Sequence, residues 1–222
     1  MVRTTLIAPA LLVGLALVAA PRACAAETEV RTFNVSVDGK PSGQYTMTIT
    51  KGDGGAVSLT CDAHVKVKVL GVTAYHYDFF DIEEWKDGRL QSLRSRCDDD
   101  GKKFEVVATA GEKGLSVKVN GSEKLVRGDA YLTTACCLPD AKRRDGALPL
   151  MEADNGEEID GKIQLVSSGP MNVAGQVVNV TRYRLTSLVA HDVWYDGADR
   201  MVRQEWTEDG HKTVLELVSV RK

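Results

Sequence analysis

Apolar and polar residues alternate along most of this chain at the two-residue period of β-strands. Tyr45, Met47 and Ile49 alternate with threonines, and Val65 and Val67 alternate with lysines. This spacing puts the apolar side chains on one face of each strand and the polar side chains on the other. No window longer than about ten residues carries the helical period. The pattern therefore predicts an all-β chain of about eleven or twelve strands.

Short turn sequences separate these strands. Asp-Gly and Asn-Gly pairs between apolar runs favour β-hairpins, because glycine takes positive φ freely and Asp or Asn tolerates it. Such pairs begin at Asp38, Asp87, Asp100, Asn120 and Asp209. Strands that follow one another through hairpins pair antiparallel, so we expect a single antiparallel sheet.

Residues 128–147 lack the alternation and end in a polar, charged run. We predict a short helical or crossover segment here, which divides one antiparallel β domain (26–222) into a first half (26–127) and a second half (148–222). A curved sheet that does not close leaves an apolar concave face that must be covered. The crossover segment is the natural cover.

One longer pattern occurs twice. The order W-x-D-G, five residues, R, five residues, D-G-x-K begins at Trp85 and again at Trp194. We interpret it as strand, turn, strand, turn, strand in each half. If the Asp209-Gly210 pair forms a two-residue turn, Arg203 faces Glu216 as a cross-strand ion pair, which needs no catalytic role for this arginine.

The first residues have the pattern of a secretory signal peptide. Arg3 supplies a positive charge, an apolar run follows, and Ala23-Cys24-Ala25 is a small-x-small cleavage site. We therefore expect residues 1–25 to be removed after Ala25, and the protein to be secreted or periplasmic. The apolar run is shorter than the ~20 residues of a membrane span, so we expect no transmembrane anchor.

Composition and motifs exclude several functions. The formal net charge of −3 gives no electrostatic reason to bind nucleic acid. The motifs G-x-S-x-G, H-E-x-x-H and C-x-x-C are absent. His64 and His76 flank the Gly71 turn, but no third ligand has a fixed spacing to them. We predict no catalytic residues, no metal site and no cofactor.

Four cysteines follow the expected cleavage site: Cys61, Cys97, Cys136 and Cys137. Export favours disulfides, and four cysteines allow three pairings. A bond between the neighbours Cys136 and Cys137 closes a strained ring. In a simple meander Cys61 and Cys97 lie two strands apart and out of line. We therefore expect Cys97 to pair with Cys136 or Cys137.

A set of aromatic residues is the remaining candidate for a binding surface. Its members are Tyr75, Tyr77, Phe79, Trp85 and Trp194. They are expected to form either a groove for an apolar ligand or part of the core.

The chain resembles a bacterial secreted family of uncharacterised function. The resemblance lies in Val37-Asp38-Gly39-Lys40-Pro41-Ser42-Gly43, Tyr75-His76-Tyr77, Glu84-Trp85 with Asp87-Gly88-Arg89-Leu90, and Asp192-Val193-Trp194-Tyr195-Asp196. That family is distantly similar to the Lol lipoprotein carriers. The resemblance implies a strongly curved antiparallel sheet, a half-barrel or open barrel, with short helices covering its concave side. It implies no catalytic residues.

These observations predict an exported, non-enzymatic β-sheet protein that binds a lipid or another apolar small molecule on its concave face. Two alternatives stay open. A secreted hydrolase requires two carboxylates about 5–10 Å apart in a polar cleft. A structural or interaction domain of the cell envelope would use an exposed sheet edge.

Overall fold

The computed structural model describes residues 27–222, so the expected signal peptide, with Cys24 and Ala25, lies outside the described residues. The first eight strands are β1 (Glu27–Val37), β2 (Lys40–Lys51), β3 (Ala56–Val69), β4 (Val72–Lys86), β5 (Arg89–Asp99), β6 (Lys102–Gly111), β7 (Gly114–Val119) and β8 (Ser122–Val126). The other seven are β9 (Tyr131–Leu132), β10 (Gly146–Met151), β11 (Glu158–Val173), β12 (Gln176–Thr186), β13 (Ala190–Tyr195), β14 (Met201–Glu208) and β15 (His211–Arg221).

All strands belong to one sheet with the order β8-β7-β6-β5-β4-β3-β2-β1-β15-β14-β13-β12-β11-β10-β9. Every pairing is antiparallel except that of β9 with β10. The predicted all-β class and antiparallel pairing are confirmed. The sheet is open as expected, with β8 and β9 as its edges, but it is not strongly curled into a half-barrel.

The sheet has 15 strands, more than the eleven or twelve predicted. The turn between β11 and β12 lies at Ala174-Gly175, with both residues at positive φ. Alanine rarely takes this conformation, so the turn has no Asp or Asn to indicate it. The crossover segment also contributes strand β9 and the first residues of β10.

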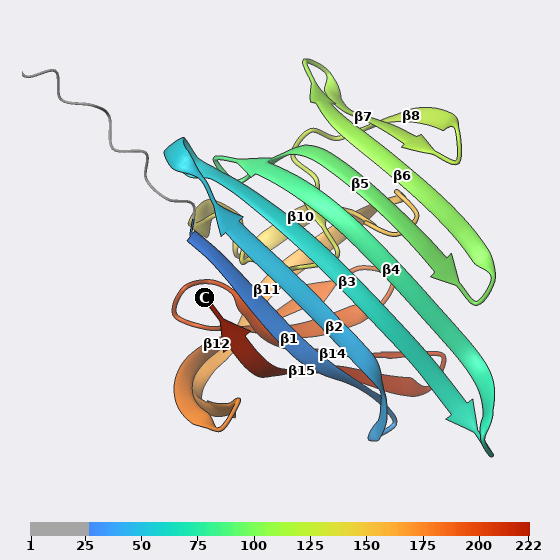
Figure 1. The fold of residues 1–222 in the computed structure, drawn as a ribbon. Helices are drawn as coiled ribbons and strands as arrows, with labels where there is room; N and C mark the ends of the chain where they lie inside the picture. Colours follow the sequence, from blue (N-terminus) through green and yellow to red (C-terminus); the bar gives the residue numbers. More distant parts are fainter. Residues whose placement is uncertain (1–26) are drawn as a thin grey trace, which may run out of the picture.

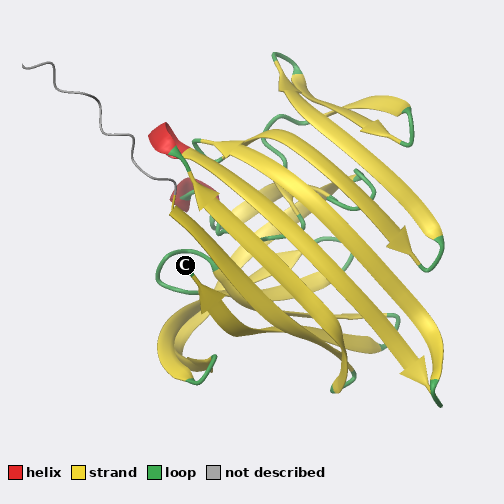
Figure 2. Cartoon of the chain, viewed as in Figure 1, coloured by secondary structure: helices red, strands yellow, loops and turns green. Residues whose placement is uncertain are grey.

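Helical structure within residues 27–222 is limited to two 3-10 turns, η1 (Asp53–Gly55) and η2 (Ala141–Arg143) (Figure 2). The expected crossover is therefore present without an α-helix. None of the helical segments in this range is long and apolar enough to span a membrane.

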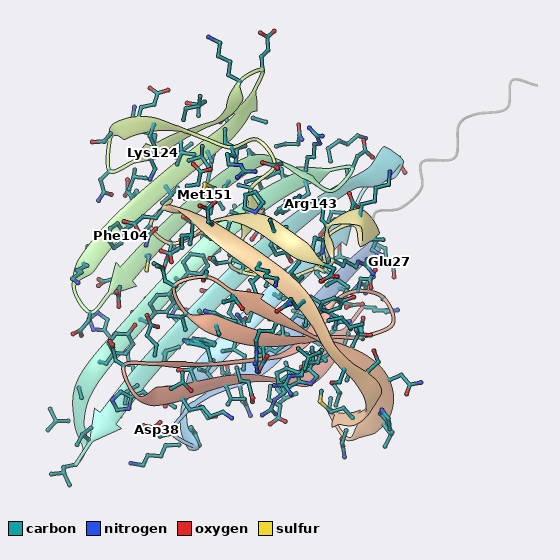
Figure 3. All side chains as sticks on the ribbon, turned by 180° about the vertical axis from the view of Figure 1, so that it is seen from behind. Glu27, Asp38, Phe104, Lys124, Arg143 and Met151 are labelled. Atoms are coloured by element: carbon teal, nitrogen blue, oxygen red, sulfur yellow. The ribbon has the colours of Figure 1, made fainter. Side chains whose placement is uncertain are left out.

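The core lies between the two halves of the sheet. Strands of the second half pass behind those of the first half (Figure 1) and in front of them in the reverse view (Figure 3). One apolar cluster includes Phe33 and Met47 of the first half and Leu148 and Met201 of the second, all fully buried. The crossover segment adds buried residues such as Leu132 to this core.

The predicted register of the β14–β15 hairpin is confirmed. The two tryptophans that begin the repeated pattern, however, do not occupy equivalent places in the sheet. Arg203 faces Glu216, and its Nη1 lies 2.9 Å from the Glu216 carboxylate. Trp85 points to the core and packs 6.1 Å from the Tyr131 ring. Trp194 points to the opposite face, between the guanidinium groups of Arg203 and a second arginine. The repeat therefore describes turns rather than a duplicated unit.

Candidate functional site

A group of polar side chains lies in the core where apolar residues are expected. We call it the thiol–carboxyl cluster, and its members are Tyr45 of β2, Cys61 of β3, Asp81 and Glu83 of β4, and Cys136 of the crossover segment. All five are less than a tenth exposed. Buried polar groups that are not fully hydrogen-bonded cost free energy, so this cluster is the candidate site.

Strand pairing brings the first members together. Cys61 is the direct partner of Asp81 in the β3–β4 ladder, so their side chains leave the sheet on the same face. The Cys61 backbone N–H donates to Asp81 Oδ1 over 3.0 Å. The other oxygen, Asp81 Oδ2, is buried without a hydrogen-bond partner. Burial, with the nearby Glu83 carboxylate, raises the pKa of Asp81 to about 10, so this carboxyl group keeps its proton at neutral pH.

Glu83 joins the sheet to the crossover segment. Its carboxylate accepts hydrogen bonds from the indole N–H of Trp85 at 2.6 Å and from the Thr134 hydroxyl at 2.7 Å. Burial raises the pKa of Glu83, while these two hydrogen bonds oppose the rise. Adjacent Asp81 and Glu83 carboxyl groups in a dry interior cannot both ionise cheaply, which favours one shared proton.

The sulfur atoms complete the cluster. Cys61 Sγ lies 3.2 Å from Cys136 Sγ, and the Tyr45 hydroxyl lies 3.3 Å from the same Cys136 sulfur. Burial raises the pKa of the Cys61 thiol well above its usual value. Cys61, Glu83 and Cys136 each present a ligand atom within 4.8 Å of the others. Two thiolates and a carboxylate are donors that Zn²⁺ accepts, so these residues could hold a metal or form a disulfide.

The expected partnership of Cys97 with Cys136 or Cys137 is not formed. All four cysteines are free thiols, and the sulfur next to Cys136 belongs to Cys61. Cys97 lies on β5 opposite Phe79. Burial, with the nearby Asp154 carboxylate, raises the pKa of Cys97 to about 12.

A second buried polar group links β1 to the second half. Glu29 accepts from Arg31 Nε at 2.5 Å and from the Arg200 guanidinium. Arg31 also contacts Asp196 at 2.5 Å and donates to the Met201 carbonyl at 2.9 Å. Burial alone would raise the pKa of Glu29, but the hydrogen bonds from Arg31 and Arg200 hold it below its usual value. The group is a paired structural network rather than a reactive one.

The five aromatic candidates are not gathered into one surface. Phe79 is part of the core cluster, and Tyr77 stacks on it with ring centroids 6.1 Å apart. Tyr75 is 37% exposed and donates to the Asp99 carboxylate. Trp85 and Trp194 pack partly against the core from opposite faces of the sheet.

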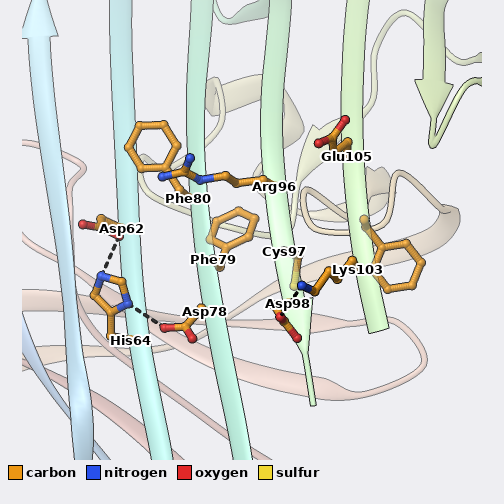
Figure 4. Close-up of a pocket in the computed structure, with 11 residues that line it drawn as sticks. Asp62, His64, Asp78, Phe79, Phe80, Arg96, Cys97, Asp98, Lys103 and Glu105 are labelled. Atoms are coloured by element: carbon orange, nitrogen blue, oxygen red, sulfur yellow. Dashed lines mark hydrogen bonds and ion pairs between the residues drawn. The ribbon is translucent and has the colours of Figure 1, made fainter. Parts of the chain in front are cut away.

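A groove of about 340 Å³ crosses the outer face of β3 to β6 (Figure 4). His64 lies in it with its two ring nitrogens 2.6 Å from Asp78 and 3.2 Å from Asp62. The hydrogen bond to Asp78 raises the pKa of His64. With both nitrogens held by carboxylates, the ring is poorly placed to act as a base. His76 does not join it, because His76 contacts Asp98 and another aspartate of the β5–β6 turn.

A larger hollow, of about 630 Å³, lies where β1, β2, β3 and β15 begin or end. Its lining combines apolar and basic side chains: Val37, Asp38, Lys40, Pro41, Ser42, Lys66, Val67, Lys68, Val69 and His211. Asp38 is engaged by His211 at 2.8 Å, which with the Lys212 backbone N–H holds the pKa of Asp38 below its usual value. None of the three lysines has an ion pair among residues 27–222.

The β3–β4 hairpin extends beyond this hollow. Its turn consists of Leu70 and Gly71, and Leu70 is fully exposed at positive φ, a conformation that a bulky residue rarely takes. Val69 and Val72 on either side are 57% and 69% exposed. The turn is therefore apolar where solvent exposure favours polar residues.

The profile of a family described as a domain of unknown function, DUF6134, matches residues 33–218. The chain belongs to the DUF6134 family. The comparison with curated proteins finds no match. A solved structure of similar fold is the beta-barrel-like protein of domain of unknown function DUF1849 from Brucella abortus. It is 8% identical, with a TM-score of 0.66, over 87% of this chain and 96% of that one. At this identity the similarity shows the fold alone.

The buried polar residues of this DUF6134 domain are the ones that sequence reasoning missed. Asp81 and Glu83 lie two and four positions after the core residue Phe79, so their side chains point to the same face of the sheet. Glu29 and Arg31 lie four and two positions before the core residue Phe33 and also share its face. The alternation therefore placed charged residues on the apolar face. A charged residue at an inward position of a strand is the signal that could have found them.

Proposed function

We propose that this DUF6134 domain is an exported, non-enzymatic protein of the cell envelope that binds an amphiphile with an apolar chain and an anionic head group. The hollow at the end of β1, β2, β3 and β15 is the observation that carries this proposal. Its volume of about 630 Å³ is in the range of small-molecule sites. The ligand class is the one expected from the sequence, but the binding place moves away from the five aromatic residues.

The lining of the hollow matches the two parts of such a ligand. Val37, Pro41 and Val67 offer apolar surface, while Lys40 and Lys66 offer positive charge. Each lysine near an anionic surface contributes about 1 kcal/mol to binding. A local basic site of this kind is compatible with a chain whose net charge is −3.

The exposed apolar turn gives the hollow an approach to lipid. Val69 lines the hollow and also borders the turn at Leu70. A hairpin that carries exposed leucine and valine beside lysines can contact the boundary between lipid head groups and acyl chains. An amphiphile could then enter the hollow without crossing bulk water.

Native mass spectrometry of the protein purified after export tests this function. We expect a bound amphiphile, and we expect the ligand-free protein to bind lysophosphatidylglycerol more tightly than zwitterionic lysophosphatidylcholine. K66E/K68E should weaken that binding at least tenfold, whereas K118E/K124E on β7 and β8 should not. Equal weakening by both double variants, or binding of neither lipid, contradicts the proposal.

The turn is tested separately by flotation with phosphatidylglycerol vesicles. L70S should reduce the fraction of protein that floats, because it removes the most exposed apolar side chain. Leu188 is 79% exposed in another turn, so L188S is the matched control. A loss of the same size in both variants would show that general surface hydrophobicity, rather than this hairpin, drives flotation.

A further inference from the structure

Two thiols that are 75 positions apart in the sequence meet inside the domain. Cys61 of β3 and Cys136 of the crossover segment have their sulfurs 3.2 Å apart, closer than the sum of two sulfur van der Waals radii. Both residues are buried, at 0% and 2% exposure. A disulfide bond is about 2.0 Å long, so a small approach of the two sulfurs would close it.

The other two cysteines have no such partner among residues 27–222. The Cys97 sulfur lies near the Tyr77 hydroxyl and Asp154. Cys137 is next to Cys136 in the sequence, where a direct bond would close a strained ring, and it forms an isolated bridge with Arg200. We propose that Cys61 and Cys136 form a disulfide and that Cys97 and Cys137 remain thiols. This proposal rests on the proposed export, because oxidising compartments are where disulfides persist.

The reaction is an exchange with a disulfide oxidant such as glutathione disulfide. One cysteine thiolate attacks the oxidant and forms a mixed disulfide, and one glutathione leaves. The second cysteine thiolate then displaces the other glutathione, forming the Cys61–Cys136 bond. The protein loses two protons and two electrons, and the oxidant is reduced to two thiols.

Burial sets the order of events. In the folded protein an oxidant cannot reach either sulfur, and the pKa of the Cys61 thiol is raised by that burial. The thiolate is the reactive form, so exchange on the folded dithiol is slow. The bond must therefore form before the crossover segment has packed onto β3, and it then holds that segment against the sheet.

Refolding of the purified, reduced protein in a glutathione redox buffer tests the pairing without depending on export. Alkylation in denaturant followed by peptide mapping should give a Cys61–Cys136 cross-linked peptide and alkylated Cys97 and Cys137. Four alkylated thiols, or a bond from Cys136 to Cys97 or Cys137, overturns the proposal. So does a stoichiometric Zn²⁺ ion that must be chelated before Cys61 and Cys136 react.

Comparison of the exported protein with protein from a reducing cytoplasm separates the two proposals. If the bond forms in the redox buffer but the natural protein is never exported, the pairing stands and the proposed localisation fails. Loss of the bond should lower Tm by about 10 °C, given the long loop that it closes. C61S/C136S should have this lower Tm, and a reducing agent should not lower it further. C97S should keep the bond, and a reducing agent should lower its Tm as it does for the wild type.

Discussion

Replacement of Asp81 by asparagine should make the domain more stable at alkaline pH than the wild type. Asp81 is fully buried, and its pKa is raised to about 10 by burial and by the carboxylate of Glu83. In the unfolded chain the same group has its ordinary pKa of 3.8. Between these two values the folded state holds a proton that the unfolded state has released, so stability falls as pH rises.

One proton of this kind corresponds to about 1.4 kcal/mol per pH unit. Between pH 5 and pH 8 the wild type should therefore lose up to about 4 kcal/mol of unfolding free energy through Asp81. Asparagine keeps the shape of the side chain. Its Oδ1 still accepts the Cys61 N–H, and its amide N–H₂ occupies the position of the unpartnered Oδ2.

Urea unfolding at pH 5, 6, 7 and 8, followed by circular dichroism, measures the difference between D81N and wild type. Titrating groups other than Glu83, which shares a proton with Asp81, cancel in that difference. We expect the stability of D81N relative to wild type to grow by up to about 1.4 kcal/mol per pH unit from pH 5 to pH 8. Asp145 is exposed, so D145N is the control and should follow the wild type. A difference between D81N and wild type that stays constant with pH would refute the reasoning.

Two further predictions concern backbone contact and buried charge. A Cβ on Gly43 would lie 1.9 Å from the His64 carbonyl oxygen, so G43A should destabilise the domain by several kcal/mol, while G169A, with open space around it, should change stability by less than about 1 kcal/mol. E29Q leaves the buried Arg200 guanidinium without a carboxylate and removes one of the two carboxylates that contact Arg31, so it should lower the free energy of unfolding by about 3–5 kcal/mol. The exposed ion-pair variant E216Q should cost less than about 1 kcal/mol. Urea unfolding midpoints measure the stability of all four variants. Equal losses of stability in G43A and G169A would contradict the argument from backbone contact, and equal losses in E29Q and E216Q would contradict the argument from buried charge.

Local patterns predicted strands and hairpin register in both halves of the sheet. The alternation of Val65 and Val67 with lysines predicted a strand there, which is part of β3, and the Asp209-Gly210 turn predicted that Arg203 faces Glu216. Both results rest on interactions between residues close in the sequence. A two-residue turn determines the register of its hairpin, and the alternation determines the buried face.

The candidate site could not be predicted in the same way. Cys136 belongs to a segment without a hydrophobic period, so no local pattern places it beside Cys61. Its position depends on how the crossover segment packs between the two halves of the sheet. The choice of Cys97 as its partner assumed a path for this segment that the tertiary packing does not follow. The buried carboxyl groups of Asp81 and Glu83 could have been predicted, because the alternation along the strand places both side chains on its core face.

The strand order has a consequence for connectivity. The pairing of β1 with β15 joins the two halves, and Glu27 and Lys222 lie beside it, with their charged groups 3.9 Å apart. If β15 were linked to β1 and the chain were opened between β8 and β9, the strands would occur along the chain in the order in which they lie in the sheet. Such a circular permutant would exchange its most distant strand pairing for a local hairpin, and lower contact order favours faster folding.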